Sequence, residues 1–137
     1  MKYTFVLLFV FVTTSLFAQL EKTIHQTFNV TDAQNIVVNI SADYELKTWP
    51  GDAMLIETNV KLENATKAIL DYVVESGRYK IVLQDQGGGS NFNLIEQTIN
   101  RAKLTTKMGL VNETVAIKIF VPENFDIGNK AQLVKKG

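Results

Sequence analysis

Apolar and polar residues alternate along much of this chain, a pattern that predicts strands with one buried face. The alternation runs through residues 27–40, with a break at Asp32–Gln34, and continues through residues 44–62. Within the second segment, Pro50-Gly51-Asp52 supplies the residue types of a tight turn. We therefore expect Tyr44 to Leu62 to form a β-hairpin whose second strand buries Met54, Ile56, Thr58, Val60 and Leu62.

After Asn64 the apolar spacing changes from that of a strand to that of a helix. Asn64 is a suitable N-cap, and Gly77 suits the positive φ that closes many helices. The sequence predicts one helix over about residues 64–76. About three helical turns are marginal in isolation, so we expect Ile69, Tyr72 and Val73 to pack against the sheet.

The remainder of the chain returns to the strand pattern. Strands are expected at Arg78–Gln84, Phe92–Glu96, Ala102–Lys107 and Thr114–Val121. A flexible, glycine-rich connection is expected at residues 85–91. The fold class that follows is mainly β (α+β), an antiparallel or solenoid-like sheet domain with one short packed helix. Residues 40–46 match residues 121–127 in residue class at five positions, which suggests a repeated strand-turn-strand corner.

The first eighteen residues have a different character from the rest. Lys2 precedes an apolar run at residues 5–12, and small residues lead up to Ala18. This order is typical of a cleaved secretory signal peptide, so we expect a signal at 1–18 and a single β-rich domain at 19–137. The protein is then expected to be exported, which for a bacterial cell means the periplasm or the cell surface. The apolar run is shorter than the roughly 20 residues that a membrane-spanning helix needs, so no membrane span is expected.

Charge and composition narrow the possible chemistry. The chain has 14 basic and 14 acidic residues, a balance that offers no broad basic surface for nucleic acid. It contains no cysteine and one histidine, His25, so disulfides, thiol catalysis, a histidine-based triad and a two-histidine metal site have no obvious construction. The acids are spread singly. We therefore expect no catalytic residues, no metal and no cofactor.

The candidate binding residues are Tyr44, Trp49 and Asp52, because turns on a rigid sheet commonly carry recognition. Tyr44 and Trp49 either stack on a glycan or peptide or fix the hairpin to the core. An alternative is a cleft between helix and sheet, lined by Ile69, Tyr72 and Val73 with Arg78 at its mouth, in a carrier of a small apolar ligand or an envelope hydrolase. A further alternative is self-association through a C-terminal edge strand before Lys135 and Lys136.

Several segments in this order resemble exported bacterial proteins of unknown function. They are Thr27-Phe28-Asn29-Val30, Glu45-Leu46-Lys47-Thr48-Trp49, Leu55-Ile56-Glu57, Ser76-Gly77-Arg78-Tyr79 and the stretch from Thr114 to Glu123 that ends Val121-Pro122-Glu123. These proteins are distantly similar to adhesin families, including the auto-transporter head type named for its Gly-Ile-Asn motif. The resemblance implies a β-rich, partly solenoidal envelope domain without established enzymatic activity, which binds an unknown protein or glycan partner or has a structural role. Because the longer relatives continue with Gly-rich rungs, we expect a form that lacks them.

Overall fold

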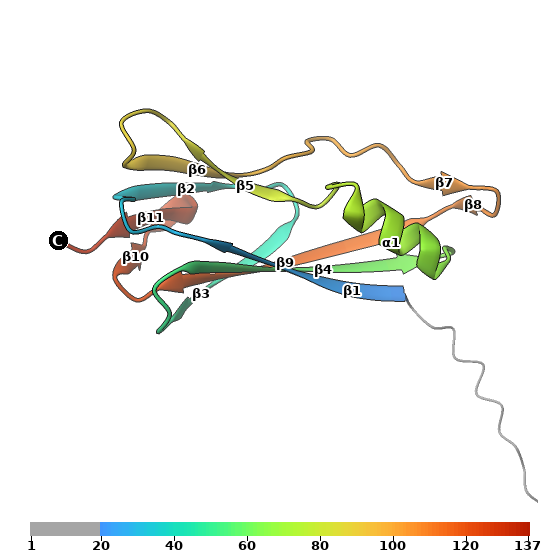
Figure 1. Cartoon of the computed structure of the whole chain (residues 1–137), viewed down its shortest axis with the longest axis horizontal. Coiled ribbons are helices and arrows are strands. Elements are labelled where there is room, and N and C mark those ends of the chain that lie inside the picture. Colours follow the sequence, from blue (N-terminus) through green and yellow to red (C-terminus); the bar gives the residue numbers. More distant parts are fainter. Residues whose placement is uncertain (1–19) are drawn as a thin grey trace, which may run out of the picture.

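The computed structural model describes residues 20–137, in which two β-sheets face each other across a shared core (Figure 1). The signal peptide expected at residues 1–18 lies outside the described residues. The chain is mainly β, with one α-helix in its described part, so the coarse fold class is confirmed. Among the described residues, no helix combines the length and apolar character needed to cross a membrane.

The first sheet has four strands in the order β1, β4, β9, β3. They are β1 (Leu20–Phe28), β3 (Asp43–Trp49), β4 (Met54–Glu63) and β9 (Asn112–Pro122). The expected buried face of β4 is confirmed, because Met54, Ile56, Thr58, Val60 and Leu62 are all at most 1% exposed. Alternate residues of β9, from Ile117 to Val121, are buried on the same side.

The hairpin expected between Tyr44 and Leu62 is wrong, because β9 lies between β3 and β4. Ile119 of β9 pairs with Leu46 in parallel on one side and with Ile56 in antiparallel fashion on the other. The turn at residues 50–53 thus joins two strands that are not neighbours. Since β9 is long and apolar on its inner side, it gains more buried area at the centre of the sheet than at an edge.

The second sheet has five strands in the order β10, β11, β2, β6, β5. They are β2 (Asn35–Asn39), β5 (Ile81–Asp85), β6 (Asn91–Glu96), β10 (Phe125–Ile127) and β11 (Gln132–Lys135). The pairs β2–β6 and β3–β9 are parallel, so both sheets are mixed, and the antiparallel alternative within the expected fold class is wrong. The expected C-terminal edge strand is also wrong, because β11 is hydrogen-bonded to β10 on one side and β2 on the other.

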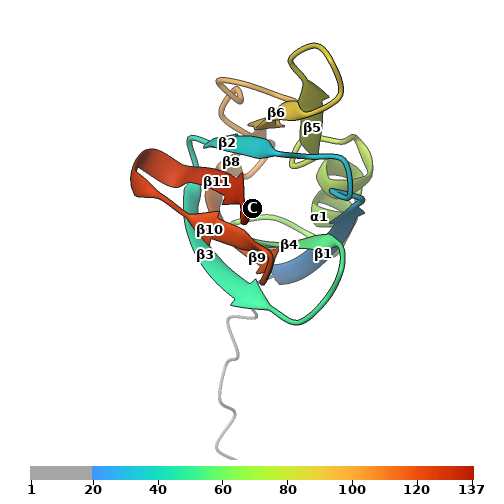
Figure 2. The same cartoon turned by 90° about the vertical axis from the view of Figure 1, so that its left-hand side faces the viewer.

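The two similar segments at residues 40–46 and 121–127 are both corners between the sheets. The first carries the chain from β2 in the second sheet to β3 in the first, and the other carries it from β9 to β10 in the opposite sense (Figure 2). Ile40 and Val121, which begin the two segments, are both buried in the core between the sheets. The shared residue pattern therefore marks two equivalent crossings.

Helix α1 (Lys67–Glu75) begins later than expected. Its N-cap is Thr66, whose hydroxyl accepts a hydrogen bond from the backbone N–H of Ile69 at 3.3 Å. Asn64 instead has a φ of +62° and donates its side-chain N–H to the carbonyls of Met108 and Leu110. Gly77 has a φ of +82°, as expected after the helix.

Of the three residues of α1 expected to pack against the sheet, Val73 and Ile69 do so, and Tyr72 does not. Leu70 and Val73 are buried in a second core cluster with Val60 and Leu62, whereas Tyr72 is 74% exposed. Of the strand expected at Ala102–Lys107, two residues form β7 (Thr105–Thr106), which pairs with β8 (Gly109–Leu110) in a short ribbon near α1 (Figure 1). A short 3-10 helix, η1 (Asn129–Ala131), connects β10 to β11.

Candidate functional site

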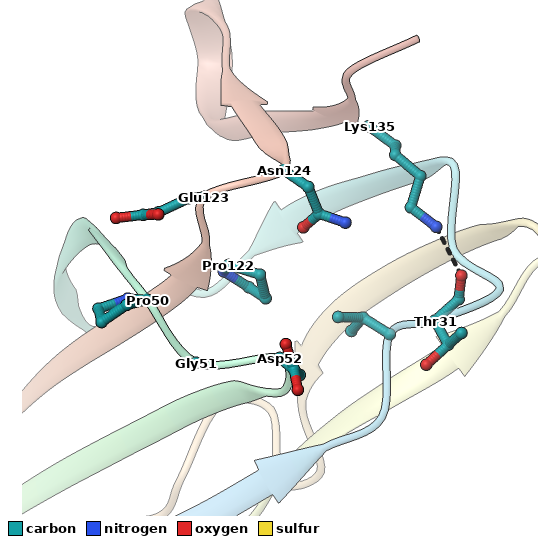
Figure 3. Close-up of a pocket in the computed structure, with 9 residues that line it drawn as sticks. Thr31, Pro50, Gly51, Asp52, Pro122, Glu123, Asn124 and Lys135 are labelled. Atoms are coloured by element: carbon teal, nitrogen blue, oxygen red, sulfur yellow. Dashed lines mark hydrogen bonds between the residues drawn. The ribbon is translucent and has the colours of Figure 1, made fainter.

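A groove of about 510 Å³ lies where three turns meet with the end of β11 (Figure 3). The turns are those between β1 and β2, between β3 and β4, and between β9 and β10. They contribute Val30 and Thr31, then Pro50, Gly51 and Asp52, then Pro122, Glu123 and Asn124, and β11 contributes Lys135. One of the candidate binding residues, Asp52, thus lines the groove.

The charged side chains that line the groove differ in whether they have a partner. Lys135 donates its ammonium to the carbonyl oxygen of Thr31 at 2.5 Å and lies 5.8 Å from the ring centroid of Phe125. Asp52 and Glu123 are exposed, and neither has a hydrogen-bond or ion-pair partner among residues 20–137. Asp52 and Glu123 therefore line the groove as carboxylates without a partner among residues 20–137, and the Lys135 ammonium uses one of its N–H donors on the carbonyl of Thr31.

Asp52 also borders a second hollow, of about 450 Å³, which shares Thr31 with the groove. The backbone here is fixed locally, because the side-chain oxygen of Asn29 accepts hydrogen bonds from both the N–H and the hydroxyl of Thr31, at 3.0 and 2.6 Å. Two prolines, Pro50 and Pro122, further restrict the turns that line the groove. Asp52 is thus presented between two hollows from a restrained backbone.

Trp49 packs on the turn that carries Asp52. Its indole N–H donates to the carbonyl of Ala53 at 3.0 Å, and its ring centroid lies 6.1 Å from that of Phe120 at an interplanar angle of 57°. A Cβ atom on Gly51 would lie 2.3 Å from the Trp49 ring, so the turn passes directly over the indole. Trp49 and Asp52 are therefore brought together, whereas Tyr44 is 36% exposed on β3 and is not part of the groove lining.

A second polar cluster lies beyond the end of α1, around Tyr79. The Arg78 guanidinium donates to both carboxylate oxygens of Glu113 at 2.8 and 3.1 Å and to the carbonyl of Ala102 at 2.6 Å, and the Tyr79 hydroxyl also donates to Glu113. The guanidinium of Arg101 lies 5.5 Å from the centroid of the Tyr79 ring. These contacts tie the loop between α1 and β5 to the start of β9 and to the segment that follows β6.

The titration of this cluster follows from its contacts. Burial, followed by the hydrogen bond to Glu113, raises the pKa of Tyr79 well above its usual value. Burial opposes ionisation of Glu113, but hydrogen bonds from Arg78 and Tyr79 outweigh it and lower the pKa of that carboxyl. The hydrogen bond with Glu113 raises the pKa of Arg78, against the effect of burial. The three pKa shifts favour a charged Arg78, an ionised Glu113 and a neutral Tyr79, which is the combination that keeps these hydrogen bonds. Such a cluster is typical of a structural anchor.

Glu96, at 6% exposure, anchors the corner between β2 and β3. Its carboxylate accepts hydrogen bonds from the hydroxyl of Ser41 at 2.7 Å and the backbone N–H of Ala42 at 3.1 Å, and Arg101 lies 3.8 Å away. Sequence reasoning missed both Glu96 and Glu113. For Glu113 the alternation along β9 was an available signal. Glu113 lies on the same side of the strand as Val115 and Ile117, which face inward, and a charged residue on that side needs a partner.

The alternative of a cleft between helix and sheet, lined by Ile69, Tyr72 and Val73, is not met by the structure. Val73 is packed in the core while Tyr72 points into solvent, so the two do not line a common cavity. Arg78 is held by Glu113 and is not at a mouth of such a cleft.

His25, the one histidine, lies within β1, where its ring nitrogen is 3.2 Å from a carboxylate oxygen of Glu57 and 57% of its side chain is exposed. Across residues 20–137, no three His, Cys, Asp or Glu side chains gather closely enough to hold a metal ion. Comparison with models of protein families, with curated proteins and with solved structures gives no match to this chain, so the resemblance to envelope adhesins remains a prediction from its residues.

Proposed function

We propose that the protein is a non-enzymatic, exported, adhesin-like binding module of the bacterial envelope. Its partner is a protein segment with a basic side chain, which binds at the groove between the three turns. The observation that carries this proposal is that Asp52 and Glu123 both line the groove and have no partner among the described residues, whereas the ammonium of Lys135 donates to the carbonyl oxygen of Thr31.

The construction of the groove favours recognition of this kind. Each lining residue comes from a turn or strand end anchored in the sandwich, and Pro50 and Pro122 limit the backbone freedom of two of those turns. Little conformational entropy is then lost on binding, which leaves more of the interaction energy for affinity. A lysine or arginine of the partner would meet Asp52 and Glu123 without first displacing a bound cation.

The binding function is tested with random peptides displayed on phage and selected on the immobilised full chain. Enriched peptides should contain Lys or Arg, and their affinity, measured by fluorescence anisotropy, should fall as salt is raised. The double variant Asp52→Asn/Glu123→Gln should weaken binding at least tenfold. Asp43→Asn is the matched control, because Asp43 is an exposed carboxylate on β3 without a partner among the described residues. Equal affinity in the double variant and the control would contradict the proposal.

Export is supported by the pattern from Lys2 to Ala18 and is tested separately. Expression of the full chain in a bacterium, followed by fractionation and mass spectrometry, should give an envelope or extracellular form that begins at Gln19. A cytoplasmic protein that retains Lys2 would contradict export, whatever the groove binds.

A further inference from the structure

The outward faces of the two sheets differ in charge. On the four-stranded sheet, paired residues place His25, Glu57, Lys118 and Glu45 in one row across the strands. Asp43, Lys47, Lys61 and Glu21 occupy outward positions in the neighbouring rows. This face is therefore densely charged and of mixed sign.

The outward face of the five-stranded sheet is composed of amides and aliphatic side chains. Its positions alternate with the buried Ile36, Val38, Leu94 and Leu133, so they point away from the core. We call them the amide face, and they form three rows: Asp126, Val134, Asn35 and Asn91; Gln132, Val37, Asn93 and Gln84; and Asn39, Ile95 and Val82. Within these described strands, the charged member is Asp126 on the edge strand, and its carboxylate lies 3.9 Å from the ammonium of Lys136.

The amides of this face keep unused hydrogen-bonding capacity. Asn35 donates to the side-chain oxygen of Asn91 at 2.9 Å, which fixes both amides and uses one donor of one and one acceptor of the other. Asn39, Asn93 and Gln132 have side chains without a hydrogen-bond partner in the described part of the chain. Val37 and Val134 lie between them and are each 39% exposed.

We infer that the amide face is a binding surface for a neutral polysaccharide. Each primary amide both donates and accepts hydrogen bonds, and sugar hydroxyls require both. The exposed valines between the amides offer apolar contact to the C–H faces of the sugar rings. A row across four strands spans about 14 Å, which is three spacings of ~4.8 Å, so the surface fits an oligosaccharide stretch of a longer chain.

The small number of charges on the amide face favours a neutral polysaccharide over a charged polymer. The outward positions of these five strands carry one carboxylate, which lies beside the exposed ammonium of Lys136, so a charged polymer meets fewer charges there than on the opposite face of the sandwich. A neutral hydroxylated chain loses little solvation energy on the amide face, because amides can replace water at each hydroxyl. This surface lies on the second sheet and is distinct from the groove, so the inference adds to the proposed function and does not depend on the basic peptide.

The inference is tested by affinity gel electrophoresis of the full chain through dextran, laminarin and galactomannan, with calorimetry for any polysaccharide that retards it. At least one of these neutral polymers should bind, with an affinity unchanged between low and high salt. The variant Asn93→Ala/Gln132→Ala should weaken binding at least tenfold and keep its melting temperature. The matched control, Thr23→Ala/Lys118→Ala, removes two outward side chains from the charged face and should bind as the unmodified chain does.

The other outcomes each overturn the inference. They are the absence of retardation by all three polymers, equal binding by the amide-face variant, and binding confined to a charged polymer such as polygalacturonate that disappears in salt. A dimer in sedimentation equilibrium that the amide-face variant dissociates would show that a second copy occupies the face. The Asp52→Asn/Glu123→Gln variant should still bind the neutral polymer, so failure of the groove proposal and failure of this one are distinguishable.

Discussion

Replacement of Thr58 by valine should stabilise the protein. Thr58 is 1% exposed on the inner face of β4, between Ile56 and Val60, which are 0% exposed. Its hydroxyl is buried and has no hydrogen-bond partner in the described chain. The unfolded chain hydrates this hydroxyl and the folded chain leaves it unpaired, so the native state carries a desolvation cost that valine, of nearly the same shape, removes.

The magnitude follows from two contributions. An unpaired buried hydroxyl costs about 1–3 kcal/mol, and part of that cost is recovered when a methyl group takes its place in close packing. We expect the free energy of unfolding to rise by about 1–2 kcal/mol, and the melting temperature by roughly 3–6 °C per kcal/mol for a domain of this size. Urea denaturation followed by circular dichroism, with unchanged m-values, measures the first quantity.

Two further variants isolate the cause. Thr58→Ser keeps the hydroxyl and removes the methyl group, so it should destabilise the protein by about 1 kcal/mol. Thr114→Val makes the same change at an exposed outward position of β9 in the same sheet and should stay within about 0.5 kcal/mol of the unmodified chain. If Thr58→Val lowers the stability while Thr114→Val does not, the hydroxyl is satisfied in solution and the reasoning is refuted.

Four other substitutions examine the anchors of the fold. Glu113→Gln should cost about 2 kcal/mol at neutral pH. The pKa of Glu113 in the folded protein lies below its ordinary value of 4.5, so ionised Glu113 stabilises the fold above pH 4.5 and this stabilisation is lost as the pH falls through the folded pKa. The urea midpoint of the Glu113→Gln variant should therefore change less between neutral and acidic pH than that of the unmodified chain. Gly51→Ala should destabilise by about 1–3 kcal/mol, since the new Cβ meets the Trp49 ring at 2.3 Å, and an unchanged thermal melt would contradict this. Leu70→Ala should cost about 2–4 kcal/mol and Tyr72→Ala less than about 0.5 kcal/mol in urea titrations, and the reverse order would mean that α1 buries its other face.

Alternation along the sequence identifies the strands and their buried faces but not their neighbours. The inner residues of β4 are all found at expected positions, because each strand's parity is a local property. The partner of β3 is β9, which is remote in sequence, and the turn between β3 and β4 favours the hairpin that does not form. Strand order depends on the total area buried by the assembled sheets, a property that no single segment encodes.

The candidate site could be predicted only in part, because local sequence identifies its turns but not which turns lie together. Asp52 belongs to a turn that local sequence identifies, and it lines the groove. Glu123, Asn124 and Lys135 reach the groove from a corner and a strand end whose positions depend on strand order. The amide face required the register of β2, β6 and β11, since Asn35 and Asn91 become neighbours through parallel pairing.

The interior position of β11 has a consequence for when the protein can fold. Gln132 and Val134 pair with Val37 and Asn35, and β10 reaches the rest of the second sheet through β11. That sheet therefore closes after residue 135 has left the ribosome, and such non-local pairing is slow, in the range of milliseconds to seconds. During synthesis, β2 and β6 can pair while the other edge of β2 waits for a strand that is still being made. This delay keeps the growing chain open until the last strand of the second sheet has been made.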